Sequence, residues 1–146
     1  MRFLPDTNIV LRAINRDDPS HPLVSGVVQA LLTRGDELVI VSQAVHKFWS
    51  VATRPAQVNG LGWSVQLVRA KIDDLVSRGS FLGDAPEVFR LWLELVTTQQ
   101  VSGKQVHDVR LAALLKARGV ETLLTLNSDD FRRFDIGVVH PREVQE

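Results

Sequence analysis

Four aspartates stand where predicted strands end or a predicted helix begins, and such side chains can bind a divalent metal ion. Asp6 follows the first short apolar segment, Asp108 opens a helical segment, and Asp129 and Asp130 follow a later β-rich run. In open α/β sheets, ligand sites gather beyond the carboxyl ends of the strands. Carboxylates brought together there repel one another unless a cation lies between them. The pattern therefore predicts a site for an oxygen-preferring cation, Mg²⁺ or Mn²⁺.

Each aspartate also has a structural interpretation. Asp6 could simply cap the helix that follows it, because aspartate is a common N-cap residue. Asp108 could interact with the helix dipole, but it shares a helical face with Leu111 and Leu115, where an unpaired carboxylate is costly. We therefore favour a site role for Asp108. The run of residues 127–130 is typical of a turn, so its spacing alone favours a structural role.

The composition restricts the chemistry further. The chain has no cysteine, which excludes disulfides and cysteine-based metal sites and leaves carboxylates and histidines as the strong ligands. Lys plus Arg equals Asp plus Glu at 17 each, so nucleic-acid binding would need a local basic patch. The candidates for such a patch are Arg54, Lys104, Arg110, Arg132 and Arg133.

No apolar run approaches the roughly 20 residues that a membrane-spanning helix needs. The start of the sequence also lacks the apolar stretch of a secretory signal. We therefore expect a cytoplasmic protein with no membrane partner.

Alternating strands and helices must position the aspartates. We expect strands at residues 3–4, 38–41, 81–82, 122–126 and 138–139. We expect helices near residues 9–14, 24–34, 43–54, 64–76, 86–97 and 106–118. Such alternation predicts an α/β fold with a parallel sheet covered on both faces. At 146 residues, the chain has the length of one domain, which we place at residues 1–146.

Four segments of the sequence, taken together, resemble a known family. They are residues 3–8, residues 41–43 with 48–55, residues 103–108 and residues 124–131. Each motif is weak alone, but their order and spacing resemble the PIN domain, and specifically the VapC-type toxins of bacterial toxin–antitoxin systems. The resemblance spans nearly the whole chain.

The resemblance implies a three-layer α/β/α PIN-like fold with a mainly parallel central sheet. It also implies a Mg²⁺- or Mn²⁺-dependent endoribonuclease that hydrolyses RNA phosphodiester bonds, and a cognate antitoxin protein as partner. We further expect a homodimer. The catalytic and metal-binding residues that the resemblance implies are Asp6, Asp108 and Asp130. The supporting polar residues are Thr7, Asn8, Asn127 and Asp129, and the sequence leaves open which of Asp129 and Asp130 faces the metal.

One position departs from the family pattern. Members usually carry a glutamate just before the Phe-Trp pair, and this chain has Lys47 there. An ammonium in place of a carboxylate changes the local charge by two units and weakens cation binding. His46 is adjacent but points about 100° away around the helix, so it does not replace the missing carboxylate.

Three functions remain open from the sequence. The first is the metal-dependent endoribonuclease toxin. The second is a PIN-like module that has lost catalysis through Lys47 and retains only RNA or protein binding. The third is a phosphoacceptor domain built on an aspartate after the first strand, although the absence of an Asp-x-Asp pair there argues against a dehalogenase-like phosphatase.

Overall fold

A five-stranded sheet forms the centre of the computed structural model, which describes residues 1–144. The strands are β1 (Arg2–Pro5), β2 (Glu37–Val41), β3 (Ser80–Leu82), β4 (Thr122–Leu124) and β5 (Gly137–Val139). All neighbouring pairs are parallel, in the order β3-β2-β1-β4-β5, which confirms the predicted parallel sheet. The last two residues of the domain predicted over 1–146 lie outside the described residues.

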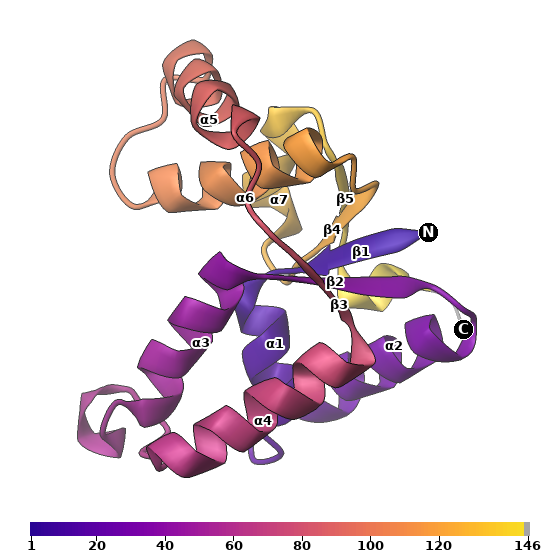
Figure 1. The fold of residues 1–146 in the computed structure, drawn as a ribbon, viewed down its shortest axis with the longest axis vertical. Coiled ribbons are helices and arrows are strands. Elements are labelled where there is room, and N and C mark those ends of the chain that lie inside the picture. Colours follow the sequence, from indigo (N-terminus) through magenta and orange to yellow (C-terminus); the bar gives the residue numbers. More distant parts are fainter. Residues whose placement is uncertain (145–146) are drawn as a thin grey trace.

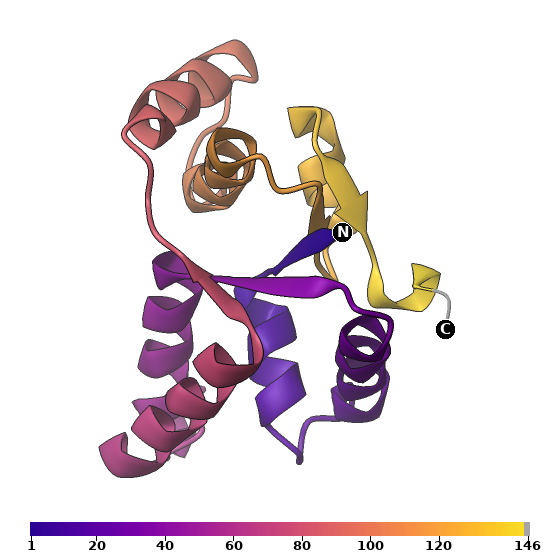
Figure 2. The ribbon, with the colours of Figure 1, turned by 45° about the vertical axis from the view of Figure 1, so that its right-hand side comes forward.

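Helices cover both faces of this sheet. The α-helices are α1 (Thr7–Ile14), α2 (His21–Thr33), α3 (Ser42–Thr53), α4 (Val65–Arg78), α5 (Glu87–Thr98), α6 (Gln105–Arg118) and α7 (Ser128–Phe131). The 3-10 turns are η1 (Ala56–Val58), η2 (Arg132–Phe134) and η3 (Pro141–Glu143). Helices α1 to α4 lie on one side of the sheet, and α5, α6 and α7 lie on the other (Figures 1 and 2). The three-layer α/β/α architecture is therefore confirmed.

Alternating side chains of the buried strands pack into two separate hydrophobic cores, one on each face of the sheet. Successive strand residues point to opposite faces. The residues that pack on the α1 and α2 side are Phe3, Leu38 and Leu124. The residues that pack on the α6 side are Leu4, Val39 and Leu123. The sheet thus holds both helical layers at fixed positions around its carboxyl edge.

A third cluster fixes α3. Phe48, which is fully buried, packs with Val10 of α1 and Val68 of α4. Its ring also meets Trp63 edge-to-face, with 6.4 Å between ring centroids. Because Phe48 follows Lys47 directly, this packing sets the direction in which the Lys47 side chain leaves the helix.

Two predicted segments near the carboxyl edge differ from the structure. The strand predicted over residues 122–126 ends at Leu124, and the next residue, Thr125, directs its hydroxyl toward Asp6. The turn predicted at residues 127–130 gives way to the short helix α7. Acidic side chains in a first helical turn are favoured by the helix dipole, and the buried Phe131 anchors the turn.

No helix within residues 1–144 is both long and apolar enough to cross a membrane.

Candidate active site

Asp6 lies at the carboxyl end of β1, the central strand, and is the N-cap residue of α1. Its side chain is only 7% exposed. One oxygen, Oδ1, accepts the backbone N–H of Thr7 at 2.6 Å, so Asp6 does cap α1. The other oxygen, Oδ2, accepts the hydroxyl of Thr125 at 3.0 Å. Capping thus uses one oxygen of Asp6 and helps to fix the carboxylate. Each oxygen accepts one hydrogen bond and keeps a lone pair for a further partner.

Thr125 links Asp6 to the segment that follows β4. Strands β1 and β4 are parallel, with Pro5 beside Leu124, so the next residues of both strands emerge together. The fully buried Thr125 donates to Asp6, and its Oγ1 accepts the backbone N–H of Asn127 at 3.1 Å. This hydroxyl therefore sets the position of Asn127 relative to Asp6.

Asp108 approaches the same place from the first turn of α6. Its side chain is half-buried and forms no hydrogen bond or ion pair within residues 1–144. Burial raises its pKa above the usual 3.8, and the charges of Asp6 and Asp130 raise it further, whereas Lys47 and His107 oppose the rise. Asp108 and Asp6 are thus close enough to repel each other, as the sequence predicts for convergent acids.

The pKa of Asp6 is raised as well. Burial is the main cause, and the hydrogen bonds from Thr125 and Thr7 and the charge of Lys47 act against it. A cation placed beside both aspartates would relieve this cost, because an opposite charge favours the ionised form.

A cavity of about 280 Å³ brings most of the predicted site residues together. Its lining residues are Asp6, Thr7, Asn8, Leu11, Lys47, Ser50, Val51, Asp108 and Asn127. Thr7 Oγ1 is buried and has no hydrogen-bond partner within residues 1–144. A buried hydroxyl without a partner beside a carboxylate is a second sign that a polar ligand belongs in this cavity.

Asp129 and Asp130 are not part of the cavity lining. The side chain of Asp129 is 91% exposed and pairs with Arg132. Asp130 is exposed too, but its negative charge helps to raise the pKa of Asp108, which links it to the acidic centre. Asn127 lines the cavity, as do Thr7 and Asn8, in agreement with their predicted neighbourhood.

Lys47 faces both aspartates from α3. It lines the acidic cavity together with Ser50 and Val51, which lie three and four residues further along the same helical face. His46 does not line this cavity but a neighbouring one of about 290 Å³, in keeping with its rotation around the helix. Lys47 is shared by the two cavities.

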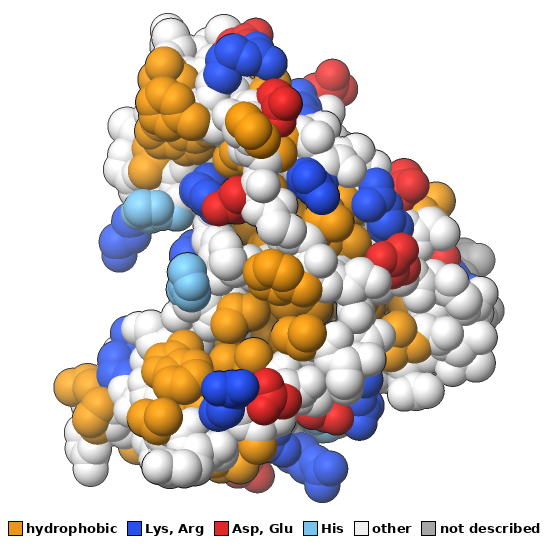
Figure 3. Space-filling model, viewed as in Figure 1, with side chains coloured by type: hydrophobic (Ala, Val, Ile, Leu, Met, Phe, Trp, Pro, Cys, Tyr) orange, Lys and Arg blue, Asp and Glu red, His pale blue; other side chains and the backbone are white. Residues whose placement is uncertain are grey.

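The neighbouring cavity is bordered by nitrogen-bearing side chains from α3 and α6. Besides Lys47 and His46, it is lined by Gln43, His107 and Arg110, and also by Ser42 and by Asp84, the carboxylate that pairs with Arg110. Figure 3 shows the molecule hollowed between the end that carries α5 and α6 and the end that carries α3, with histidine and basic side chains at the rim. Lys47 and Arg110 outnumber the single carboxylate of this cavity, so the surface beside the acidic centre favours an anion.

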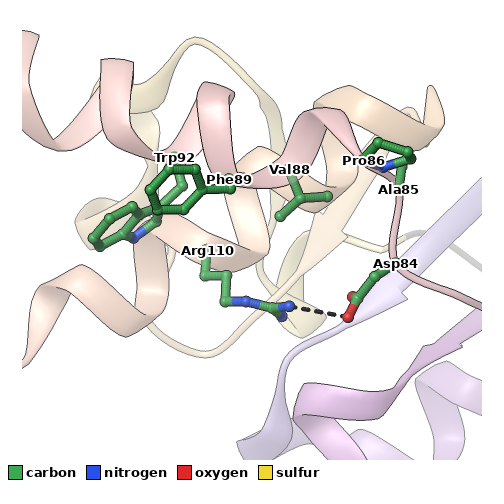
Figure 4. Close-up of a pocket in the computed structure, with 7 residues that line it drawn as sticks. All are labelled: Asp84, Ala85, Pro86, Val88, Phe89, Trp92 and Arg110. Atoms are coloured by element: carbon green, nitrogen blue, oxygen red, sulfur yellow. Dashed lines mark hydrogen bonds and ion pairs between the residues drawn. The ribbon is translucent and has the colours of Figure 1, made fainter.

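A larger cavity of about 430 Å³ lies under α5 and is lined by none of the predicted catalytic or metal-binding residues, although Arg110 of the predicted basic patch borders it. Phe89 stacks on Trp92 there, and Arg110 pairs with Asp84 at 3.1 Å (Figure 4). Its lining is mainly apolar, and Arg110 and Asp84 are its charged residues. It therefore lacks the cluster of acids that a metal site would need.

The donors present fit one divalent ion better than the three-aspartate site that the resemblance implies. Within residues 1–144, no three His, Asp or Glu side chains are gathered closely enough to hold a metal. Asp6 and Asp108 share one cavity with the unpartnered Thr7 hydroxyl. Mg²⁺ is commonly bound through one or two carboxylates and otherwise keeps its waters. The two aspartates are therefore a suitable donor set for one such ion.

Thr125 and Ser50 are site residues that the sequence reasoning missed. Thr125 falls inside the strand predicted over residues 122–126, and only the β1–β4 register shows that it lies beside Asp6. Ser50 could have been found from its spacing, since it lies three residues beyond Lys47 on a predicted helix.

Comparison with known proteins adds an independent finding. No model of a protein family matches the sequence. The protein named Ribonuclease VapC24, from two strains of Mycobacterium tuberculosis, is 30% identical over 134 residues, which cover 88% of this chain and 88% of that protein.

Solved structures share the fold at lower identity. VapBC2 from Rickettsia felis, bound to a promoter DNA fragment, has a TM-score of 0.73 and 19% identity, covering 96% of this chain and 98% of that chain. VapBC-1 from nontypeable Haemophilus influenzae has a TM-score of 0.71 and 16% identity, covering 98% of this chain and all of that chain. With the sequence identity to VapC24 extending over most of both proteins, the chain belongs to the VapC family of PIN-domain proteins.

Proposed function

We propose that this chain is an endoribonuclease and the toxin of a toxin–antitoxin pair. The observation that carries the proposal is the meeting of Asp6 and Asp108 in one open cavity at the carboxyl edge of the sheet. The relatives support it, because VapC24 is named a ribonuclease and the solved structures are named as VapBC complexes. Residues 1–146 would act as one PIN-like domain.

We propose Mg²⁺ or Mn²⁺ as the cofactor, held by Asp6 and Asp108. Asp130, whose charge acts on Asp108, is proposed as a further acid of the site that is not a ligand of the ion, in place of the predicted role as a third metal ligand. Such an ion, when bound, supplies Lewis acidity that activates water and offsets negative charge on the phosphate.

The protein's own groups hold this centre in place. Thr7 N–H and the Thr125 hydroxyl orient the Asp6 carboxylate from two sides. Asn127, positioned by Thr125, and Asn8 present polar groups to the same cavity. Residues that orient metal-binding carboxylates typically change metal affinity by about 10-fold to 100-fold when they are removed.

RNA would enter along the rim that joins the two cavities. His46, His107 and Arg110 border the cavity next to Lys47, where they could contact phosphates on either side of the cut. Arg110 is already oriented by Asp84 and by Gln43 Oε1, at 3.1 Å each. A pre-oriented guanidinium is well suited to bind a phosphate.

We propose that the protein partners are a cognate antitoxin and a second copy of this chain. Hydrophobic side chains gather over α5 in Figure 3, where Phe89 is 67% exposed and Leu93 is 48% exposed. Apolar surface of this kind is suited to a protein contact. A cytoplasmic location remains our prediction.

Lys47 also supports a second candidate function. Its ammonium lies in the acidic cavity and opposes the entry of a metal ion. If it abolishes catalysis, the chain would be a PIN-like module that binds RNA or a partner protein without cutting.

RNA cleavage by the purified chain separates the two candidates. We expect a single-stranded RNA to be cut in Mg²⁺, with the activity lost on addition of EDTA and restored by excess Mg²⁺. Asp6→Asn should lose about 100-fold or more of the rate, whereas Asp129→Asn, at an exposed acid paired with Arg132, should keep the native rate. RNA binding without cleavage at any Mg²⁺ or Mn²⁺ concentration would favour the binding module instead.

A further inference from the structure

Among residues 1–144, Lys47 is the one side chain that brings a positive charge to the lining of the acidic cavity. The cavity lining includes two carboxylates, Asp6 and Asp108, and a single basic residue, Lys47. The lysine reaches it from α3, where the fully buried Phe48 fixes the helix against α1 and α4. Its position is therefore set by core packing and not by a surface loop.

The ammonium of Lys47 has no hydrogen-bond or ion-pair partner within residues 1–144. Arg110 of the same rim differs, since it is bound to Asp84 and to Gln43. A lysine ammonium offers three N–H donors. Those of Lys47 remain available to a ligand that enters between the two cavities.

The net charge of the acidic cavity decides which kind of ligand Lys47 can bind. With both carboxylates ionised and Lys47 protonated, the cavity carries one net negative charge and repels a phosphate. One divalent cation reverses this to one net positive charge. With a carboxylate at position 47, one divalent cation would leave the cavity negative, and a second cation would be needed before a phosphate could bind.

We propose that Lys47 is a catalytic residue that takes the place of a second metal ion, with its ammonium binding a non-bridging oxygen of the RNA phosphate that is cut. The site then works with one divalent ion, held by Asp6 and Asp108. This rests on the proposed ribonuclease function. Lys47 does not enter any bond that forms or breaks, and its contribution is to offset charge as the phosphate gains it in the transition state.

Counting bound Mn²⁺ by electron paramagnetic resonance tests the proposal without relying on activity. We expect one Mn²⁺ per native chain. Lys47→Glu should bind Mn²⁺ at least about 10-fold more tightly and take up a second ion, because the charge beside the metal changes by two units. Lys116→Met removes an exposed lysine from the last turn of α6, whereas Asp108 lies in the first turn. This variant should match the native protein in Mn²⁺ count and affinity. Two Mn²⁺ ions on the native chain, or equal affinity in Lys47→Glu, would overturn the proposal.

The kinetics of RNA cleavage provide a second test of the role proposed for Lys47. At saturating Mg²⁺, Lys47→Met should lower the cleavage rate by about 100-fold, the size typical for loss of one electrostatic donor, and Lys47→Arg should recover part of it. A native rate in Lys47→Met contradicts the role of Lys47 while leaving the ribonuclease function intact. If the native chain cuts no RNA, the proposed function fails, and the Mn²⁺ count still decides whether Lys47 limits the site to one ion.

Discussion

The hydroxyl of Thr125 donates a 3.0 Å hydrogen bond to Oδ2 of Asp6, although the two residues are 119 positions apart in the sequence. The parallel pairing of β1 with β4 makes this contact possible, since Pro5 lies beside Leu124 and the two chains leave the sheet together. The same hydroxyl accepts the N–H of Asn127. One small side chain therefore connects the central aspartate to the last motif of the sequence.

Replacing Thr125 by valine tests this connection. The substitution keeps the shape but removes the hydroxyl, so Asp6 Oδ2 and the Asn127 N–H both lose a buried partner. We expect Mn²⁺ affinity to fall about 10-fold to 100-fold and the free energy of unfolding to fall by about 1–3 kcal/mol. Thr125→Ser keeps the hydroxyl and should retain most of the metal affinity. If valine and serine gave the same Mn²⁺ affinity, the hydrogen bonds would not matter for the site.

Asp108→Asn should make stability less dependent on pH. Because the folded-state pKa of Asp108 is raised above 3.8, the folded protein holds this proton more tightly than the unfolded chain does. Stability therefore falls as pH rises from about 3.8 through the folded-state pKa. Asparagine removes that loss, so the variant should be more stable than the native chain at pH 7, by up to about 1 kcal/mol for a partly solvated charge.

Urea unfolding in EDTA, followed from pH 3 to pH 8, measures this effect. The stability difference between Asp108→Asn and the native chain should be near zero at the acid end and grow as pH rises. A native chain that is more stable than the variant at pH 7 without metal would show that the ionised Asp108 carboxylate does not destabilise the folded protein.

Phe48→Ala tests whether core packing holds α3, and with it Lys47, in place. Phe48 is fully buried, so we expect a loss of about 3–5 kcal/mol in the free energy of unfolding. Phe89→Ala removes a ring that is 67% exposed and should cost less than about 1 kcal/mol in the isolated chain. Denaturant unfolding of both variants provides the comparison, and similar losses would contradict the assigned core.

The sequence was sufficient for most of the helices and strands and for naming Asp6 and Asp108 as candidates, because both depend on local patterns. Apolar periodicity predicts α6, and Gly119 ends it in the left-handed conformation that a non-glycine residue would find strained. Asp108 could be selected because its helical face is otherwise apolar. These inferences needed no knowledge of which strands are neighbours.

What the sequence could not provide depends on strand order and on distance. The Thr125 contact requires β4 to lie next to β1 and not elsewhere in the sheet. Likewise, the motif order treats Asp129 and Asp130 alike, and only the structure shows that Asp129 points to Arg132 while Asp130 acts on Asp108. Local sequence spacing does not show that Thr125 lies beside Asp6, or which of the two acids acts on Asp108.

A double-mutant cycle on RNA cleavage tests most directly whether Asp6 and Asp108 form one catalytic site. The rates of the native chain, Asp6→Asn, Asp108→Asn and the double variant are measured in saturating Mg²⁺, with folding checked by thermal unfolding. Groups that act as a unit are strongly non-additive, so each single variant should lose about 100-fold or more and the double variant should be no slower than the slower single. A double variant whose loss is the product of the single losses, or a single variant that keeps the native rate, would contradict a shared site.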